Sequence, residues 1–231
     1  SDLVFDTDVL LLVFNFRDGG IRESRFDHRV SCVDFREPYF AVAFAHERLA
    51  FFHASEAGKA VTYLPLPVPC TVSCLQLGEK RDELLVGTHE GRVLRLHVAQ
   101  GFATLRAETQ VLRGHSLAGG SFSQTTSPTF YQVNAVAFCA RQPGAFFLSG
   151  GSEGRVLLWE RDARERLREF ACGAPVVELK AHPALGLVVA CLGYDWAQGI
   201  YGTEKVNYKP SVVVLALSED DFRLAAPAYV R

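Results

Sequence analysis

Gly87–Thr–His–Glu–Gly–Arg–Val93 and Gly150–Gly–Ser–Glu–Gly–Arg–Val156 are two copies of nearly the same stretch of sequence. In both, a glycine follows a glutamate, which suits a tight turn because glycine supplies a positive φ and the acidic side chain can cap backbone amides. Each stretch follows a run of small and apolar residues, Glu83 to Thr88 in one copy and Ala145 to Gly151 in the other. The chain therefore contains an internal repeat. A repeat of this kind indicates the class of fold more strongly than the secondary structure expected for any single segment.

Outward from these turns, a unit of short strands recurs along the chain. Its first strand has alternating apolar residues, and helical periodicity is missing almost everywhere. First strands are expected at Arg29 to Phe35, Thr71 to Leu77, Gln132 to Phe138 and Pro175 to Ala181. Second strands are expected at Phe40 to Ala45, Glu83 to Thr88, Ala145 to Gly151 and Gly186 to Gly193. Third strands are expected at Arg48 to Ala54, Arg92 to Val98, Arg155 to Glu160 and Ser211 to Leu217, and outer strands at Val61 to Pro67 and Glu165 to Ala171.

Four short antiparallel strands in roughly 40 residues, ending near an aromatic residue such as Trp159, are typical of the blades of a WD-repeat β-propeller. A β-sandwich also has short alternating strands, but it does not predict the same Glu–Gly–Arg–Val turn at the same place in two units. We therefore predict an all-β fold of the WD-repeat β-propeller class, with seven blades of which about four and a half are present.

The repeat also predicts the domain organisation. We expect one propeller domain over residues 1–231, in which residues 1–16 end a preceding blade and the N-terminal blades are missing. Complete blades are expected at 17–67, 70–115, 131–171 and 175–231, the last with an insertion at 194–210. A ring cannot leave its first and last sheets uncovered, so we expect the remaining blades from further chain or from a partner.

The composition argues against several classes of function. The chain has 24 Lys and Arg against 26 Asp and Glu, a formal net charge of -2, so no global positive field attracts nucleic acid. Apolar runs such as Val9 to Phe14 are far shorter than the roughly 20 residues that a membrane span needs. The six cysteines include no Cys-x-x-Cys pair, and most lie in apolar runs, which favours a reducing, intracellular compartment.

Catalysis finds little support in the sequence. The seven histidines are scattered without the spacing of a metal site. Gly151–Ser–Glu–Gly154 falls in a β-turn and not in the strand–turn–helix context of a serine nucleophile. A propeller hydrolase would use His115 and Asp195, but we favour a structural His115 that links a turn to a strand by hydrogen bonds. We therefore expect a binding protein with no catalytic residue, metal, cofactor or small-molecule substrate.

Further motifs carry a resemblance to one family of WD-repeat proteins. They are Tyr131–Gln–Val–Asn–Ala–Val–Ala–Phe138, Leu158–Trp–Glu–Arg–Asp–Ala–Arg164, Gly193–Tyr–Asp–Trp–Ala–Gln–Gly199 and Arg113–Gly–His115. With the Glu–Gly–Arg–Val turns, they resemble the family shared by the nuclear-pore mRNA-export factor and the mitotic-checkpoint protein of budding-inhibited type. The Tyr–Asp–Trp motif and the residues after Trp159 are closer to the export factor, whereas residues 200–210 differ in detail.

The resemblance implies a platform that binds a short hairpin motif, found in a nucleoporin for the export factor and in checkpoint kinases for its relative. It also implies a location in the nucleus, at the nuclear pore and in the cytoplasm. The motif carries glutamates, so Arg92 is the first candidate partner, because a guanidinium meets a carboxylate with two parallel hydrogen bonds. Glu90 shapes the turn of Arg92, and Arg155 is the matching arginine of the later repeat. Alternatively, both arginines form structural ion pairs with neighbouring blades.

Tyr194, Asp195 and Trp196 form another candidate contact for a protein partner. They break the apolar pattern in a loop, and an aromatic pair beside a charge is common in binding surfaces. The alternative is an insertion that packs against the rim of the propeller.

Single-stranded RNA is a further possible ligand. Bases would stack on Trp159, and phosphates would pair with Arg113, Arg161 and Arg164. The opposing interpretation is stronger, because the last aromatic of a WD blade is usually buried. Arg161 and Arg164 also alternate with acidic residues, which is typical of a solvated turn.

Overall fold

Short β-strands make up almost all of the described chain. The computed structural model describes residues 9–14, 21–26, 29–36, 38–44, 48–53, 60–78, 82–99, 104–105, 110–117, 129–139, 145–161, 166–182, 184–196 and 209–223. These residues form antiparallel sheets, followed by one 3-10 helix, η2 (Glu219–Phe222). The predicted all-β class is confirmed. Within the described ranges, no helix has the length and apolar character to cross a membrane.

Four sheets of three or more strands carry the repeat. The first contains β3 (Val30–Arg36), β4 (Tyr39–Phe44), β5 (Arg48–His53) and β6 (Ala60–Pro65). The second contains β7 (Val72–Leu77), β8 (Glu83–Thr88) and β9 (Arg92–Ala99), with β10 (Thr104–Leu105) and β11 (Gln110–Arg113) both paired to β9. The third contains β14 (Val133–Phe138), β15 (Phe146–Gly151), β16 (Arg155–Glu160) and β17 (Arg166–Ala171). The last contains β18 (Val176–Ala181), β19 (Leu187–Leu192) and β20 (Ser211–Ala216).

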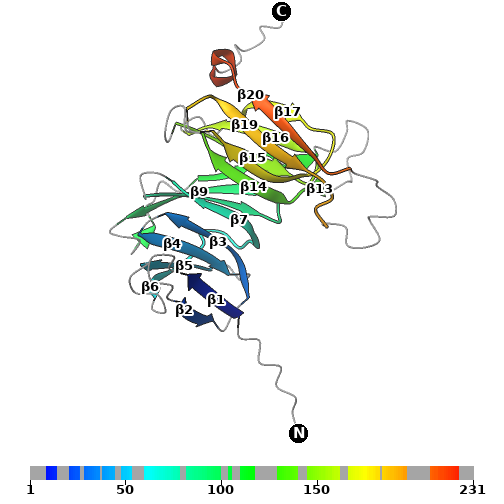
Figure 1. Ribbon diagram of the computed structural model, residues 1–231. Coiled ribbons are helices and arrows are strands. Elements are labelled where there is room, and N and C mark those ends of the chain that lie inside the picture. Colours follow the sequence, from blue (N-terminus) through cyan, green and yellow to red (C-terminus); the bar gives the residue numbers. More distant parts are fainter. Residues whose placement is uncertain are drawn as a thin grey trace, which may run out of the picture.

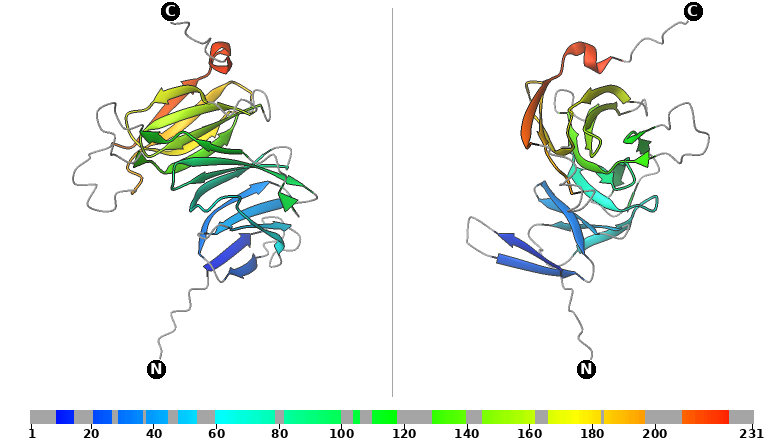
Figure 2. Two further views of the ribbon diagram at one scale, coloured as in Figure 1. Left: turned by 180° about the vertical axis from the view of Figure 1, so that it is seen from behind. Right: turned by 90° about the vertical axis from the view of Figure 1, so that its right-hand side faces the viewer.

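The sheets follow one another in chain order. Figure 1 shows this order from β3–β6 to β18–β20, and a small pair, β12 (Ser116–Leu117) with β13 (Thr129–Phe130), lies between the second and third sheets in sequence. The right-hand view of Figure 2 shows the sheets along an arc. The described strands do not close this arc into a ring.

The first hairpin differs from the predicted blade boundary. The sequence pattern places residues 21–26 in the blade expected at 17–67, whereas these residues form β2 (Ile21–Phe26), which pairs with β1 (Val9–Phe14) in a separate two-stranded sheet. Phe26 is buried against the first four-stranded sheet, with its ring 5.2 Å from that of Phe44 and 5.5 Å from that of Phe52. Residues 1–8 and 15–20, and residues 197–208 of the predicted insertion, lie outside the described residues.

Side-chain hydrogen bonds set the register between neighbouring first strands. Asp34 on β3 accepts a hydrogen bond at 2.7 Å from the backbone N–H of Leu77 on β7. Gln76 on β7 accepts one at 2.7 Å from the N–H of Phe138 on β14. Asp34 and Gln76 occupy the same position of the repeat, as do Leu77 and Phe138. The same pair of repeat positions is therefore bonded between β3 and β7 and between β7 and β14. The three first strands run in the same direction.

A second set of side-chain bonds continues this arrangement to the last sheet. The hydroxyl of Ser73 on β7 donates to the carbonyl of Val133 on β14. The amide of Asn134 on β14 donates to the carbonyl of Val176 on β18 at 2.9 Å. Ser73 and Asn134 again share one position of the repeat. The first strands of three successive sheets are thus tied at matching heights.

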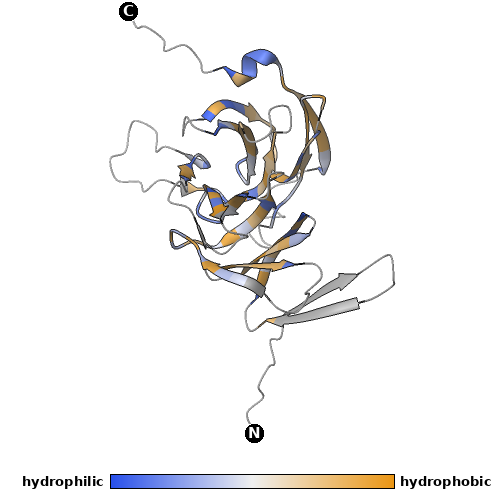
Figure 3. Cartoon of the chain, turned by 90° about the vertical axis from the view of Figure 1, so that its left-hand side faces the viewer, coloured by the Kyte–Doolittle hydropathy of each residue, from blue (hydrophilic) through white to orange (hydrophobic). Residues whose placement is uncertain are grey.

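Apolar clusters fill the spaces between successive sheets. One lies between the first and second sheets around Phe51 and Leu77, one between the second and third around Leu85 and Phe147, and one between the third and last around Leu179. Figure 3 shows hydrophobic residues concentrated in the strands, whereas η2 is hydrophilic. Burial of apolar surface stabilises the stack by roughly 25 cal/mol for each Å² removed from water.

The two glycines of the repeated turns have the positive φ that the sequence predicts, 71° at Gly91 and 78° at Gly154. Gly91 also lies close to the chain that leads into the third sheet. A Cβ atom added at Gly91 would lie 2.4 Å from the carbonyl oxygen of His115 and 2.9 Å from that of Tyr131. Only glycine fits at this junction.

We expect Gly91→Ala to lower the free energy of unfolding by about 2–4 kcal/mol, because the methyl group meets fixed backbone as well as an unfavourable φ. Gly173→Ala is the matched control, since Gly173 has φ 76° but nothing within 4 Å of an added Cβ. Its expected cost is about 1–2 kcal/mol, from the backbone conformation alone. Urea denaturation measures both values, and equal losses would contradict the close approach of the sheets at Gly91.

Candidate partner-binding site

Because the first strands run in the same direction, each described turn that follows a second strand lies at the same end of the sheets. We call this end the turn rim. It comprises residues 69–71, 88–92, 113–116, 131–134, 151–155, 174–176 and 193–196. Both Glu–Gly–Arg–Val turns and the Tyr–Asp–Trp motif belong to it.

The Arg92 turn is fixed by its own backbone and by its acidic residue. Both carboxylate oxygens of Glu90 accept a hydrogen bond from the N–H of Thr71, at 3.0 and 3.2 Å. The N–H of Arg92 donates to the hydroxyl of Thr88 at 3.2 Å. The Arg92 guanidinium donates to the carbonyl of Pro69 at 3.3 Å. Glu90 therefore caps a backbone amide, although this amide belongs to Thr71 before β7 and not to the turn itself, and the bond ties the Arg92 turn to the start of β7.

Arg92 lies directly opposite a second arginine. In the antiparallel pair of β9 and β11, Arg92 is in register with Arg113, which is exposed. Like charges opposite each other on neighbouring strands are destabilising unless an anion lies near them. Within the described parts of the chain, no carboxylate forms an ion pair with either guanidinium. The two arginines are suited to bind a carboxylate or phosphate from another molecule.

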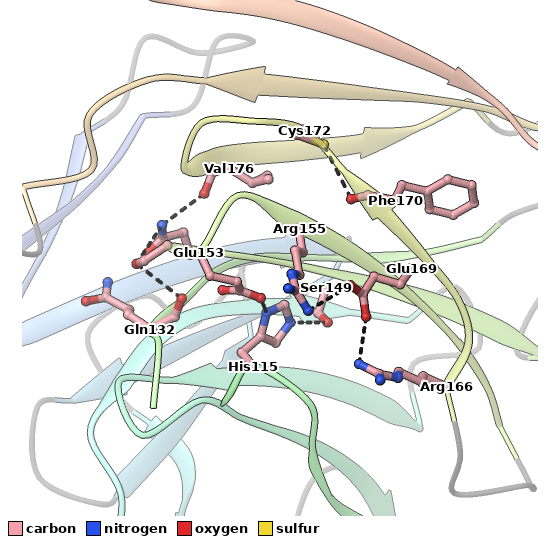
Figure 4. A network of polar contacts seen from close by, with 12 residues as sticks. His115, Gln132, Ser149, Glu153, Arg155, Arg166, Glu169, Phe170, Cys172 and Val176 are labelled. Atoms are coloured by element: carbon pink, nitrogen blue, oxygen red, sulfur yellow. Dashed lines mark hydrogen bonds and ion pairs between the residues drawn. The ribbon is translucent and has the colours of Figure 1, made fainter. Parts of the chain in front are cut away.

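Arg155 has a different environment from Arg92. Its guanidinium lies 2.7 Å from one carboxylate oxygen of Glu169, and the other oxygen lies 2.8 Å from Arg166 (Figure 4). Arg155 and Glu169 are each about one-third exposed. The structural ion pair weighed for Arg155 is therefore present, although it lies within one sheet and not between blades.

His115 is the centre of a buried hydrogen-bond network (Figure 4). Its Nδ1 lies 2.5 Å from a carboxylate oxygen of Glu153, and its Nε2 lies 2.7 Å from the hydroxyl of Ser149. The indole N–H of Trp159 donates to the same hydroxyl at 2.9 Å. The His115 side chain is fully buried. The prediction of a structural His115 that links turn to strand is confirmed.

The tryptophan of this network has no surface for a base. Trp159 is 2% exposed, and its ring stacks on Phe147 with centroids 6.2 Å apart. Gly114 closes another side, because a Cβ there would lie 2.5 Å from the Trp159 ring. The structure thus corrects the proposed stacking of RNA on Trp159, in favour of the opposing interpretation.

Arg161 also has a structural partner. Its guanidinium lies 3.2 Å from the carboxylate of Glu83, which forms a buried ion pair with Arg95 at 2.8 Å. His97 lies 4.0 Å from the same carboxylate. Arg161 is one-third exposed and joins the second sheet to the third, so it is neither a free RNA contact nor a purely solvated residue. Arg164 lies outside the described residues.

The Tyr–Asp–Trp segment lies at the rim of the last sheet. Asp195 accepts a hydrogen bond at 2.9 Å from the side-chain amide of Asn134. The rings of Tyr194 and Trp196 meet edge to face, with centroids 5.3 Å apart. Trp196 is 63% exposed and has a φ of 62°, the only positive φ among the described non-glycine residues. This segment combines a fixed carboxylate with an exposed aromatic ring.

Two of the thiols, those of Cys32 and Cys74, are poor candidates for a nucleophile. Burial raises the pKa of Cys74 to about 12 and holds the pKa of Cys32 well above its usual value. A neutral, buried thiol is a poor nucleophile. Among the described residues, no three His, Cys, Asp or Glu side chains are grouped to hold a metal ion.

Comparison with solved structures identifies the architecture. The β-propeller domain of Cps50 (Swd1) from Myceliophteria thermophila superposes with a TM-score of 0.55 at 17% identity, covering 71% of this chain and 48% of that one. The fold is a WD-repeat β-propeller. The sheets of this propeller are its blades, and their open arc is that of a partial ring.

Known sequences similar to the propeller are mRNA-export proteins, although no family model matches it. The Poly(A)+ RNA export protein of Schizosaccharomyces pombe is 24% identical over 84% of this chain and 53% of its own length. The mRNA export factor rae-1 of Caenorhabditis elegans is 23% identical over 83% and 50%, respectively. The mRNA export factor GLE2 of Chaetomium thermophilum is 21% identical over 84% and 52%. The chain spans about half the length of these relatives, and the predicted resemblance to export factors is confirmed.

Sequence reasoning missed three residues that shape the propeller's rim and blade junctions: Glu83, Arg95 and Asn134. Charged residues inside an otherwise apolar strand were the available signal, since Glu83 and Arg95 stand in runs of leucine and valine. Asn134 lies inside a repeat motif, and nothing local marks its bond to Asp195, 61 residues away.

We expect Ser149→Ala to lower the free energy of unfolding by about 2 kcal/mol, because it leaves the buried Nε2 of His115 and the indole N–H of Trp159 without their shared partner. Ser211→Ala, at an exposed position of β20, should change it by less than about 0.5 kcal/mol. Thermal unfolding followed by circular dichroism compares the two. Equal stability of both variants would show that the His115 network contributes nothing.

Proposed function

We propose that this propeller is a non-enzymatic docking platform of the mRNA-export machinery, and that its turn rim binds an acidic hairpin motif of a nucleoporin. The observation that supports the proposal is the pair Arg92 and Arg113, opposite each other on β9 and β11. Its relatives are named as mRNA-export proteins. On this proposal the protein works at the nuclear pore and passes between nucleus and cytoplasm.

The charges of the turn rim favour an acidic partner. Its carboxylates are engaged internally: Glu90 by the Thr71 amide, Glu153 by His115, and Asp195 by Asn134. The Arg92 and Arg113 side chains have no such carboxylate among the described residues. A glutamate of the partner would accept two parallel hydrogen bonds from one planar guanidinium, which lysine cannot donate.

A hairpin motif of the same type in checkpoint kinases has the same chemistry, so it is the natural competitor in a binding assay. RNA is a weaker candidate for this surface, because Trp159 is buried and Arg161 is paired with Glu83. A hydrolase is weaker still, since His115 is fully buried and bonded on both ring nitrogens.

We expect Arg92→Ala to raise the Kd for a synthetic nucleoporin hairpin peptide at least tenfold, because a charge-assisted pair is lost. Arg92→Lys should recover only part of the affinity, since it restores the charge without the bidentate geometry. Isothermal titration calorimetry gives the three values.

Arg223→Ala is the matched control, because Arg223 is an exposed arginine that pairs with Asp220 beside η2. It should bind the peptide as the unaltered protein does. Tight binding by Arg92→Ala, or no binding by the unaltered protein, would reject the proposed site. If a checkpoint-kinase peptide binds more tightly than the nucleoporin peptide in a competition assay, the partner is the kinase and not the nucleoporin.

A further inference from the structure

Trp196 has an unusual backbone for its size and exposure. Its φ is 62°, a left-handed conformation that bulky residues rarely adopt, and its side chain is 63% exposed. Such a conformation persists only where the surrounding structure enforces it, and these positions cluster at ligand contacts. Within the described chain the indole meets the ring of Tyr194 but stays mostly exposed, so the observation calls for a role at the surface.

Asn134 ties the loop that carries Trp196 to the neighbouring sheets. Its side-chain nitrogen donates to the Asp195 carboxylate and to the Val176 carbonyl, each at 2.9 Å. It also lies 3.4 Å from the hydroxyl of Ser152 in the neighbouring turn. One amide thus joins the third blade, the start of β18 and the loop that carries Trp196.

The loop is held from two other sides. The N–H of Gly193 donates to the carbonyl of Pro175 at 3.0 Å, which fixes the chain where it leaves β19. The ring of Tyr194 meets that of Trp196 at an interplanar angle of 71°, so it limits the rotation of the indole. An indole restrained in this way before a partner arrives would lower the entropy cost of binding.

Trp196 shares the turn rim with Arg92. Both follow the second strand of a blade, and the matched register of β7, β14 and β18 brings these positions to one face of the propeller. A tryptophan and an arginine are the residue types that most often dominate the energy of protein interfaces. They would engage an apolar and an acidic side chain of one bound segment.

We infer that Trp196 is a preformed anchor for an apolar side chain of the acidic protein segment that docks at Arg92, and that Asn134 is its positioning residue. This inference rests on the proposed function. A peptide is favoured over RNA because its apolar side chain can lie beside the Asp195 carboxylate while its acidic residues lie at Arg92, whereas every nucleotide of RNA brings a phosphate that Asp195 repels. Asn134 acts through Asp195 and makes no contact with the partner.

Iodide quenching of fluorescence tests the anchor, because the chain has two tryptophans and Trp159 is buried. Quenching by iodide therefore reports on Trp196. A nucleoporin hairpin peptide without tryptophan should reduce the quenching constant at least twofold on binding. A single-stranded adenine oligonucleotide at the same concentration should leave it unchanged. Protection by the oligonucleotide alone would overturn the inference in favour of RNA.

Substitutions test the two roles separately. Trp196→Ala should weaken peptide binding about tenfold, and Asn134→Ala should weaken it and change the quenching constant of the unbound protein. The double variant should bind no more weakly than Trp196→Ala alone, because Asn134 acts through Trp196. Arg223→Ala is again the control: Arg223 pairs with Asp220 of η2, outside the turn rim, and its variant should bind normally.

The outcomes separate this inference from the proposed function. If Arg92→Ala loses binding and Trp196→Ala does not, the anchor is wrong and the proposed function stands. If the unaltered protein fails to bind the peptide, both are wrong. If Asn134→Ala binds normally, or if its loss simply adds to that of Trp196→Ala, Asn134 has no positioning role. The unfolding midpoint of each variant identifies any loss that comes from misfolding.

Discussion

The bonds between neighbouring first strands are the constraint on which the rest of the structure depends. A polar side chain of one first strand bonds to the backbone of the next, as Ser73 does to Val133 and Asn134 to Val176. Apolar packing alone has no direction and would tolerate a shift between blades. These hydrogen bonds fix the direction of each first strand and its position along the neighbouring strand. As a result, turns that are far apart in sequence lie on one face of the propeller.

Two polar networks join neighbouring blades, and the polar and basic residues in them stabilise the fold and are not available to a partner. Glu83 and Arg95 are almost fully buried, and Arg161 of the next blade completes their pair. A buried charge without its partner costs several kcal/mol, so removing one member would destabilise the junction strongly. His115 makes a similar junction through Ser149. The residues left for partners are those at the turn rim whose charges are not already engaged within the described chain.

The sequence predicted what depends on local pattern. Alternating residues located the first strands within a residue or two, and the Glu–Gly–Arg–Val repeat predicted the positive φ of Gly91 and Gly154. The sequence pattern did not predict the features that depend on contacts between residues far apart in the chain. Arg161 resembled a solvated residue because its neighbours alternate in charge, whereas its partner Glu83 is in another blade. The left-handed φ of Trp196 likewise follows from tertiary bonds and not from the residues beside it.

The proposed docking face is the turn rim, and not the opposite end of the blades. Hydrogen–deuterium exchange of the protein with and without the nucleoporin hairpin peptide distinguishes the two faces. Docking at the turn rim slows amide exchange around Thr71, Arg92 and Trp196, with no change around Gly78, Cys139 and His182 at the other end. Slower exchange at that other end alone would contradict it.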